Sequence, residues 1–233
     1  MAEARRQLTL DVGHRTETWS RADFVESPAN REALGWIERW PDWPAPALTL
    51  YGPPGCGRTH LGRVWAARAE AETMTGTDIA ALDVAALAEL ASRARRVFID
   101  DARLAPERGL FHLYNLLRER GGHLLLAADR PPAQWEIRLP DLASRLRASP
   151  AIAIDPPDDE LLGSILLKLF ADRQLHAAPG VIAYLVSRME RSADAARGLV
   201  AALDRRALTE GREIDRRLCA DVLGGLSNEP VDR

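Results

Sequence analysis

Apolar runs alternate with amphipathic stretches along the first two thirds of the chain. Short apolar runs with the length of buried strands occupy Leu48–Tyr51, Val97–Ile99, Leu124–Ala127 and Ala151–Ile154. Around them, apolar residues recur at helical spacing over about residues 28–40, 59–71, 80–95, 110–120 and 139–147. Strands that are apolar throughout and alternate with helices are typical of a parallel sheet with helices on both faces. We therefore predict an α/β fold with a parallel five-stranded sheet.

The pattern changes at Asp155-Pro156-Pro157. Beyond this point the sequence has only helical periodicity, over about residues 159–173, 179–190, 193–209 and 215–223. We predict a flexible leader over residues 1–20, an α/β domain over 21–155, a small all-helical lid domain over 156–226 and a disordered tail over 227–233.

Composition is that of an ordinary globular protein, with 46% hydrophobic and 28% charged residues. The formal net charge of −3 gives no general attraction to nucleic acid, so direct sequence-specific DNA binding is not expected. The two cysteines, Cys56 and Cys219, form neither a disulfide framework nor a zinc pattern. The first residues lack a signal peptide, and the longest aliphatic runs are too short to cross a bilayer. These features predict a cytoplasmic protein without a membrane partner.

A glycine-rich loop follows the first predicted strand and opens a helix, which is the context of a phosphate-binding loop. Its residues, with the one that follows, are Gly52, Pro53, Pro54, Gly55, Cys56, Gly57, Arg58, Thr59 and His60. Backbone N–H groups of such a loop and the start of the helix attract phosphate oxygens. The Thr59 hydroxyl would bind Mg²⁺. The alternative is a glycine-rich turn without a ligand.

Arg58 departs from the usual loop, in which a lysine stands at this position. Lysine places a compact charge between the β- and γ-phosphates, whereas the arginine guanidinium is bulkier and planar. We expect nucleotide binding with altered γ-phosphate geometry.

Two carboxylates, Asp100 and Asp101, follow the strand Val97–Ile99. Taken alone, such a pair more often caps a helix or lies in a loop. Together with the phosphate loop, Asp100 is predicted to hold Mg²⁺, which prefers oxygen ligands, and Asp101 to polarise an attacking water.

Four segments carry a resemblance to a known family: Asp23–Asn30, Phe111–Asn115, Ala128–Pro132 and Leu139–Leu146. With the phosphate loop, they resemble the DnaA clade of AAA+ proteins, and most closely the Hda family of regulatory inactivators of DnaA. The resemblance covers roughly residues 7–226. It implies a P-loop AAA+ module followed by a helical lid, and a bound adenine nucleotide, ADP or ATP.

Two features favour Hda over DnaA. The chain ends soon after the lid, near Leu226, which leaves no room for the helix-turn-helix DNA-binding domain of DnaA. The leader residues Gln7, Leu8, Leu10 and Val12 are similar to the peptide with which Hda binds the DNA sliding clamp. In such a peptide, the Gln7 amide would make polar contacts at the rim of a pocket, and the aliphatic side chains would anchor in it. The alternative is a chance amphipathic leader.

The resemblance implies a mechanism in which the chain, bound to the clamp, stimulates ATP hydrolysis by DnaA. Arg145 matches the arginine finger of the family, a device that accelerates related NTPases by about 10³–10⁵. Asp129 matches the sensor-one position. The alternative for Arg145 is a solvated arginine on a helix, and the alternative for Asp129 is an aspartate that forms a turn.

Asp194 is predicted to occupy the slot of the lid's sensor-two arginine, where it would repel phosphates. Arg191 and Arg197 lie about one helical turn to either side and could substitute. With Arg58, this predicts a site that binds nucleotide weakly or prefers the diphosphate, and a chain that is not itself a productive ATPase.

Two other functions stay open. One is an autonomous AAA+ ATPase of the initiator or helicase-loader type, and the other is a clamp-tethered scaffold with a degenerate nucleotide site. The sequence does not decide whether the chain forms a homo-oligomer.

Overall fold

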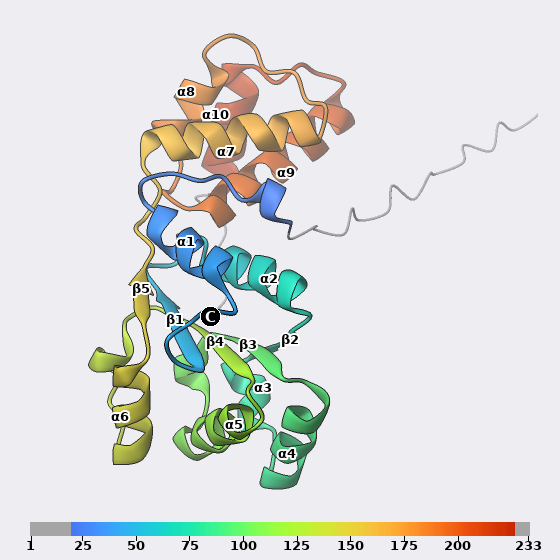
Figure 1. The fold of residues 1–233 in the computed structure, drawn as a ribbon. Coiled ribbons are helices and arrows are strands. Elements are labelled where there is room, and N and C mark those ends of the chain that lie inside the picture. Colours follow the sequence, from blue (N-terminus) through green and yellow to red (C-terminus); the bar gives the residue numbers. More distant parts are fainter. Residues whose placement is uncertain (1–19, 227–233) are drawn as a thin grey trace, which may run out of the picture.

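A parallel five-stranded sheet lies at the centre of the fold, as Figure 1 shows. The computed structural model describes residues 20–226, and its strand order is β2-β3-β4-β1-β5. The strands are β1 (Ala47–Tyr51), β2 (Glu72–Thr75), β3 (Arg96–Asp100), β4 (His123–Ala128) and β5 (Ala151–Ala153). The predicted α/β class with a parallel five-stranded sheet is confirmed.

Helices connect the strands and then form the rest of the described chain. Those of the sheet region are η1 (Arg21–Asp23), α1 (Arg31–Arg39), α2 (Arg58–Ala69), α3 (Gly76–Ala80), α4 (Val84–Arg93), η2 (Ala102–Leu104), α5 (Glu107–Glu119), η3 (Pro132–Gln134) and α6 (Pro140–Ala148). They are followed by α7 (Asp159–Asp172), α8 (Val181–Val186), α9 (Ala193–Glu210) and α10 (Arg216–Leu226).

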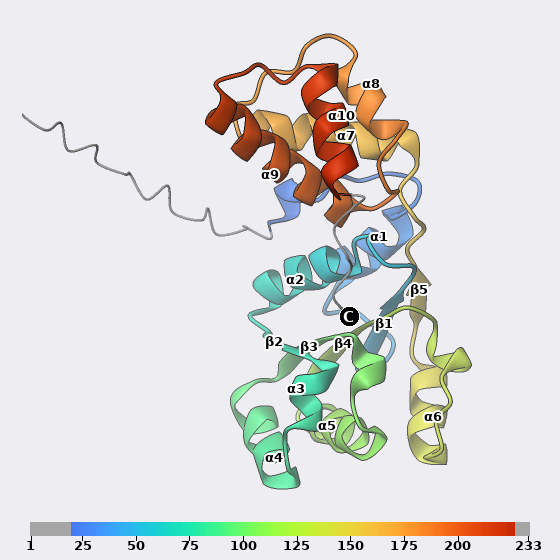
Figure 2. The same ribbon diagram turned by 180° about the vertical axis from the view of Figure 1, so that it is seen from behind.

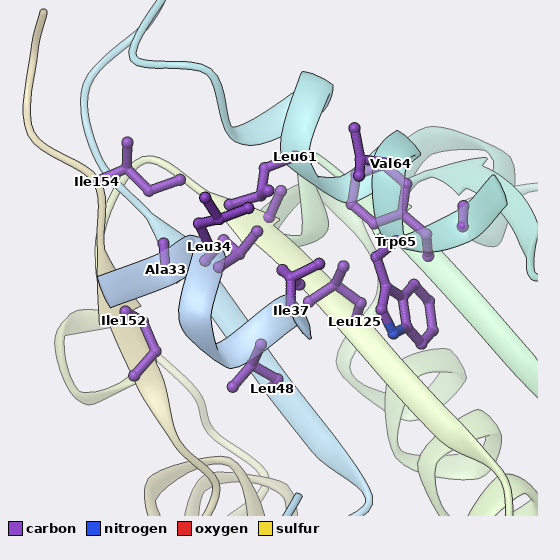
Figure 3. Close-up of a cluster of buried hydrophobic side chains, with 14 of the residues drawn as sticks. Ala33, Leu34, Ile37, Leu48, Leu61, Val64, Trp65, Leu125, Ile152 and Ile154 are labelled. Atoms are coloured by element: carbon purple, nitrogen blue, oxygen red, sulfur yellow. The ribbon is translucent and has the colours of Figure 1, made fainter. Parts of the chain in front are cut away.

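Each face of the sheet has its own hydrophobic cluster, because successive strand residues point to opposite faces. Phe98 and Leu125 pack with α1 and α2 on one face, around the fully buried Trp65. Figure 3 shows this cluster, to which β1 and β5 also contribute. Val97 and Leu124 pack with α4, α5 and α6 on the other face. The sheet is therefore covered on both sides, as its apolar strands predict.

The strand β2 was not located by the apolar pattern. Its sequence Glu-Thr-Met-Thr alternates half-buried and exposed side chains, and it pairs with β3 at the edge of the sheet. An edge strand is packed less completely than a central one, so it needs no continuous apolar run.

The helix predicted over residues 80–95 is found as α4, which is shorter, and the separate helix α3 before it was not predicted. A capping box at Thr75 and Asp78 begins α3, which ends at Ala80, and Asp83 begins α4 by accepting a hydrogen bond from the Ala86 N–H. These short polar side chains satisfy the first N–H groups of a new helix, which favours a break over a continuous helix. Likewise, α8 spans only Val181–Val186 of the predicted 179–190.

The C-terminal helices α7–α10 enclose a third hydrophobic cluster, which includes Phe170, Leu199 and Leu218. Figure 2, the view from behind, shows these helices at one end of the molecule and α6 at the other. The predicted division of the chain after Asp155 stays a prediction. Between residues 20 and 226, no helix is long and apolar enough to span a membrane.

Candidate nucleotide-binding site

The glycine-rich loop connects β1 to α2 in a conformation that depends on its glycines. Gly55 and Gly57 have φ angles of +71° and +104°, in the left-handed region that disfavours other residues. At Gly52, an added Cβ would overlap the carbonyl oxygen of Ile154. The loop is thus held by its glycines close to the carboxyl end of the sheet.

The start of α2 presents backbone N–H groups that have no partner within the helix. Its first backbone hydrogen bond joins the Leu61 N–H to the Gly57 carbonyl at 2.9 Å, and no side chain caps the helix. N–H groups of the preceding turn therefore have no partner within the helix and carry partial positive charge. The Nη1 atom of Arg58 is buried and has no hydrogen-bond partner among the described residues. A bound anion would satisfy these donors.

Thr59 and Asp100 lie together, as the sequence predicts. The Thr59 hydroxyl donates to Asp100 Oδ2 at 2.7 Å, which links the phosphate loop to the end of β3. The other Asp100 oxygen accepts from the Asp101 N–H at 3.1 Å. Asp101 is exposed and has a left-handed backbone with φ +46°. The Asp100 carboxylate thus lies beside the loop.

Asp129 follows β4 next to the loop, because the Gly52 N–H donates to the carbonyl of Ala128 at 3.3 Å. Its carboxylate already has partners: both oxygens accept from Arg103 Nη1 at 2.7 Å, and one accepts from Arg130 Nε at 3.1 Å. The Arg103 hydrogen bonds, with help from Arg130, hold the pKa of Asp129 below its usual value. Sequence reasoning did not single out Arg103, whose role depends on a contact between separate loops.

The start of α9 abuts the phosphate loop. The Ala193 N–H donates to the Gly55 carbonyl at 3.0 Å, and an added Cβ on Gly55 would overlap the Ser192 hydroxyl. Ser192 also caps α9 by accepting from the N–H groups of Asp194 and Ala195. Sequence reasoning missed Ser192, although a serine before a helix is a recognisable capping signal.

Asp194, predicted to occupy the sensor-two slot, lies in the first turn of α9. Its side chain is 69% exposed and forms an ion pair with Arg197, whose side chain is only 23% exposed. The Arg197 charge also acts on His60, in the first turn of α2. The Asp194 charge acts on His60 as well, and on Cys56 of the loop, so both members of this ion pair lie near the start of α2. Arg191 is held by Asp159 at 2.7 Å and is exposed, so it does not substitute.

His60 and Phe24 line the start of α2. Their rings meet edge to face with centroids 5.3 Å apart, so the segment before α1 packs against the loop. Burial, followed by the positive charge of Arg197, lowers the pKa of His60 to about 4. The imidazole is therefore neutral at neutral pH.

Solved structures with the same fold include replication initiators. Domain III of DnaA from Thermotoga maritima superposes with a TM-score of 0.77 at 20% identity, covering 91% of this chain and 98% of that chain. AMPPCP-bound DnaA from Aquifex aeolicus superposes with a TM-score of 0.69 at 20% identity, and the match covers 83% of this chain and 67% of that chain. A point variant of RuvB from Thermotoga maritima superposes with a TM-score of 0.72 at 14% identity. The match covers 91% of this chain and 73% of that chain. No protein-family model matches the sequence.

The chain has the AAA+ P-loop fold. In this AAA+ module the phosphate loop, Thr59 and Asp100 meet at the carboxyl end of the sheet, beside the start of α9.

The remaining predicted residues belong partly to the loop and partly to other elements. Pro53 and Pro54 are exposed on the loop, and Cys56 is buried within it. Burial raises the pKa of the Cys56 thiol, which keeps it protonated. Arg145 lies on α6 and contacts α5, on the opposite face of the sheet from α2. The leader residues Gln7, Leu8, Leu10 and Val12 lie outside the described residues.

Proposed function

We propose that this chain is a regulatory AAA+ protein that binds the DNA sliding clamp and stimulates ATP hydrolysis by the replication initiator DnaA. The chain itself binds an adenine nucleotide with Mg²⁺. Its action negatively regulates replication initiation, because DnaA is converted to its ADP form.

Nucleotide binding is supported by the fit of the loop to phosphate. Its glycines allow close approach, the α2 start offers unpaired N–H groups, and Arg58 has an unpaired buried donor. AMPPCP-bound DnaA from Aquifex aeolicus, with the same fold, favours an adenine nucleotide as the ligand.

A magnesium ion fits beside Thr59 and Asp100, whose side-chain oxygens already lie 2.7 Å apart. Among residues 20–226, no group of three or more His, Cys, Asp or Glu side chains gathers at a metal site. Mg²⁺ commonly binds through one or two protein oxygens together with nucleotide phosphates and water, so this sparse site suits it.

The position of Arg145 carries the regulatory part of the proposal. The loop faces the start of α9, whereas α6 lies at the end of the molecule away from α7–α10 in Figures 1 and 2. Arg145, which belongs to α6, therefore lies on an element apart from its own phosphate loop and is suited to act on the nucleotide of another protein. A guanidinium supplied in this way stabilises the charge that develops on a transferred phosphoryl group.

The choice of partners rests on the resemblance to the Hda family. The fold likeness extends over nearly all of DnaA domain III, which supports an interface between two related AAA+ modules. Gln7, Leu8, Leu10 and Val12 supply the clamp-binding peptide. Association of this chain with itself would use the same surfaces.

Hydrolysis of ATP preloaded on the cognate DnaA, in the presence of clamp-loaded DNA, tests this function. We expect the parent protein to accelerate hydrolysis, and Arg145→Ala to abolish the acceleration at every protein concentration. Arg147→Ala is the matched control, because Arg147 is an exposed arginine of the same helix. Gln7→Ala should require much more protein for the same rate, since it weakens only the clamp contact.

Failure of the parent to accelerate hydrolysis would contradict the proposal. Steady ATP turnover by this chain alone would then indicate the autonomous ATPase. Clamp binding without any effect on DnaA would indicate the scaffold.

A further inference from the structure

The guanidinium of Arg145 lies over two aromatic rings of α5. Its central carbon is 4.9 Å from the ring centroid of Phe111 and 5.5 Å from that of Tyr114. Both distances are within the range of cation–π attraction. Within residues 20–226, Arg145 contacts these two rings and forms no ion pair, so aromatic rings orient its charge.

One donor of this guanidinium has no partner. The Nη1 atom of Arg145 is buried and makes no hydrogen bond within the described residues. Its burial holds this part of the guanidinium inside the fold, while Arg145 as a whole is only half-buried. The arginine thus has a fixed direction and remains partly accessible to another molecule.

The two helices that carry this arrangement are tied to each other. Glu107, at the start of α5, accepts hydrogen bonds from the N–H groups of Arg138 and Leu139 at 3.0 and 2.8 Å, just before α6 begins. Leu142 and Leu146 are buried in the same cluster as Leu113 of α5. The rings and the arginine are therefore held in register by both polar and apolar contacts.

We infer that Phe111 and Tyr114 are positioning residues for Arg145, which hold its guanidinium ready for a phosphate oxygen of a partner's nucleotide. This inference rests on the proposed function. A carboxylate partner would also orient the arginine, but it would neutralise the charge and compete with the incoming phosphate. Aromatic rings orient the guanidinium and leave its charge available.

Stimulated hydrolysis of DnaA-bound ATP separates positioning from binding. In Phe111→Leu, we expect the maximal stimulated rate to fall by about ten-fold, because a loosely held finger is seldom in the productive geometry. The protein concentration for half-maximal stimulation should stay unchanged. Phe111→Tyr should restore the rate, and His112→Ala, at the exposed neighbouring position, should have no effect. Full activity of Phe111→Leu, or a change only in the half-maximal concentration, would overturn the inference.

Arginine side-chain NMR tests the same contact without the partner. In the parent, the guanidinium signals of Arg145, assigned by their loss in Arg145→Lys, should be shifted upfield by the ring currents. In Phe111→Leu the shift should largely disappear, while circular dichroism shows an unchanged fold. Absence of the shift in the parent would overturn the inference directly. A shift in a parent that does not stimulate DnaA would overturn the proposed function, and with it the catalytic purpose of the contact.

Discussion

Arg58 is the residue at which the nucleotide site departs most from a standard phosphate loop. Its guanidinium occupies the place of a compact ammonium group, and its Nη1 atom is buried without a partner among the described residues. We expect Arg58 to bind the diphosphate adequately and the triphosphate poorly, because the planar group fits less well between the β- and γ-phosphates.

Arg58→Lys should therefore improve ATP affinity relative to ADP affinity by roughly ten-fold, equivalent to about 1.4 kcal/mol. Isothermal titration with both nucleotides in the presence of Mg²⁺ measures this ratio. Arg108→Lys, the same change at an exposed position on α5, should leave the ratio unaltered. An unchanged ratio in Arg58→Lys would show that Arg58 does not set the preference.

His60 makes the stability of the fold depend on pH. Burial and the charge of Arg197 lower its pKa from 6.5 to about 4, so between these values the unfolded chain binds more protons than the folded one. Stability should consequently fall as pH drops from 6.5 to 4, by on the order of 3 kcal/mol from this group. Below pH 4 its contribution should fall no further.

His60→Gln removes this titration. Urea unfolding of the variant between pH 7 and 4 should show a shallower loss of stability than the parent. Parallel curves for the two proteins over this range would contradict the assignment.

Contacts between elements explain which glycines are required. Gly55 touches Ser192 at the start of α9, whereas Gly211 at the end of α9 has open space around it, and both have positive φ angles of +71° and +61°. Gly211→Ala should cost only the backbone strain, about 1 kcal/mol. Gly55→Ala should cost about 2–3 kcal/mol, because it adds an overlap with Ser192. Urea unfolding compares them, and equal losses would exclude a tight contact between α9 and the loop.

Two helical glycines offer a similar comparison. An added Cβ on Gly62 of α2 would overlap the ring of Phe98 in β3, whereas Gly198 of α9 has nothing within 4 Å. Gly62→Ala should destabilise by about 1–3 kcal/mol, from overpacking. Gly198→Ala should stabilise by about 0.5–1 kcal/mol, from helix propensity. Thermal unfolding measures both, and changes of the same sign would contradict the packing of α2 on the sheet.

The sequence predicts an element well when one physical effect dominates it. The strands β1, β3 and β4 are buried inside the sheet, so their apolar runs are sufficient signals, and β5 at the other edge also has an apolar sequence. The edge strand β2 and the break between α3 and α4 depend on polar side chains, which periodicity does not capture. The phosphate loop follows from local sequence order, whereas its link to Asp100 is expected because both segments follow apolar strands of one parallel sheet. The Arg103–Asp129 pair, the Ser192–Gly55 contact and the rings beneath Arg145 join distant segments, and only the fold brings them together.

At the scale of the whole molecule, the candidate nucleotide site and Arg145 belong to different elements. The candidate site lies between the sheet and the start of α9, so the C-terminal helices contact the phosphate loop directly. Arg145 belongs to α6, and Figures 1 and 2 show this helix at the other end of the molecule from α7–α10. A module of this shape can receive a nucleotide at one surface and offer a guanidinium at another.

A calorimetric titration of the full chain with ADP and Mg²⁺ is the decisive test of the candidate nucleotide site. We predict saturable binding of one ADP per chain, with the Mg²⁺ dependence lost in Thr59→Val and Asp100→Asn while the fold is retained. An absence of binding by the parent at millimolar ADP and ATP, or a Mg²⁺ dependence that both variants preserve, would contradict the site described here.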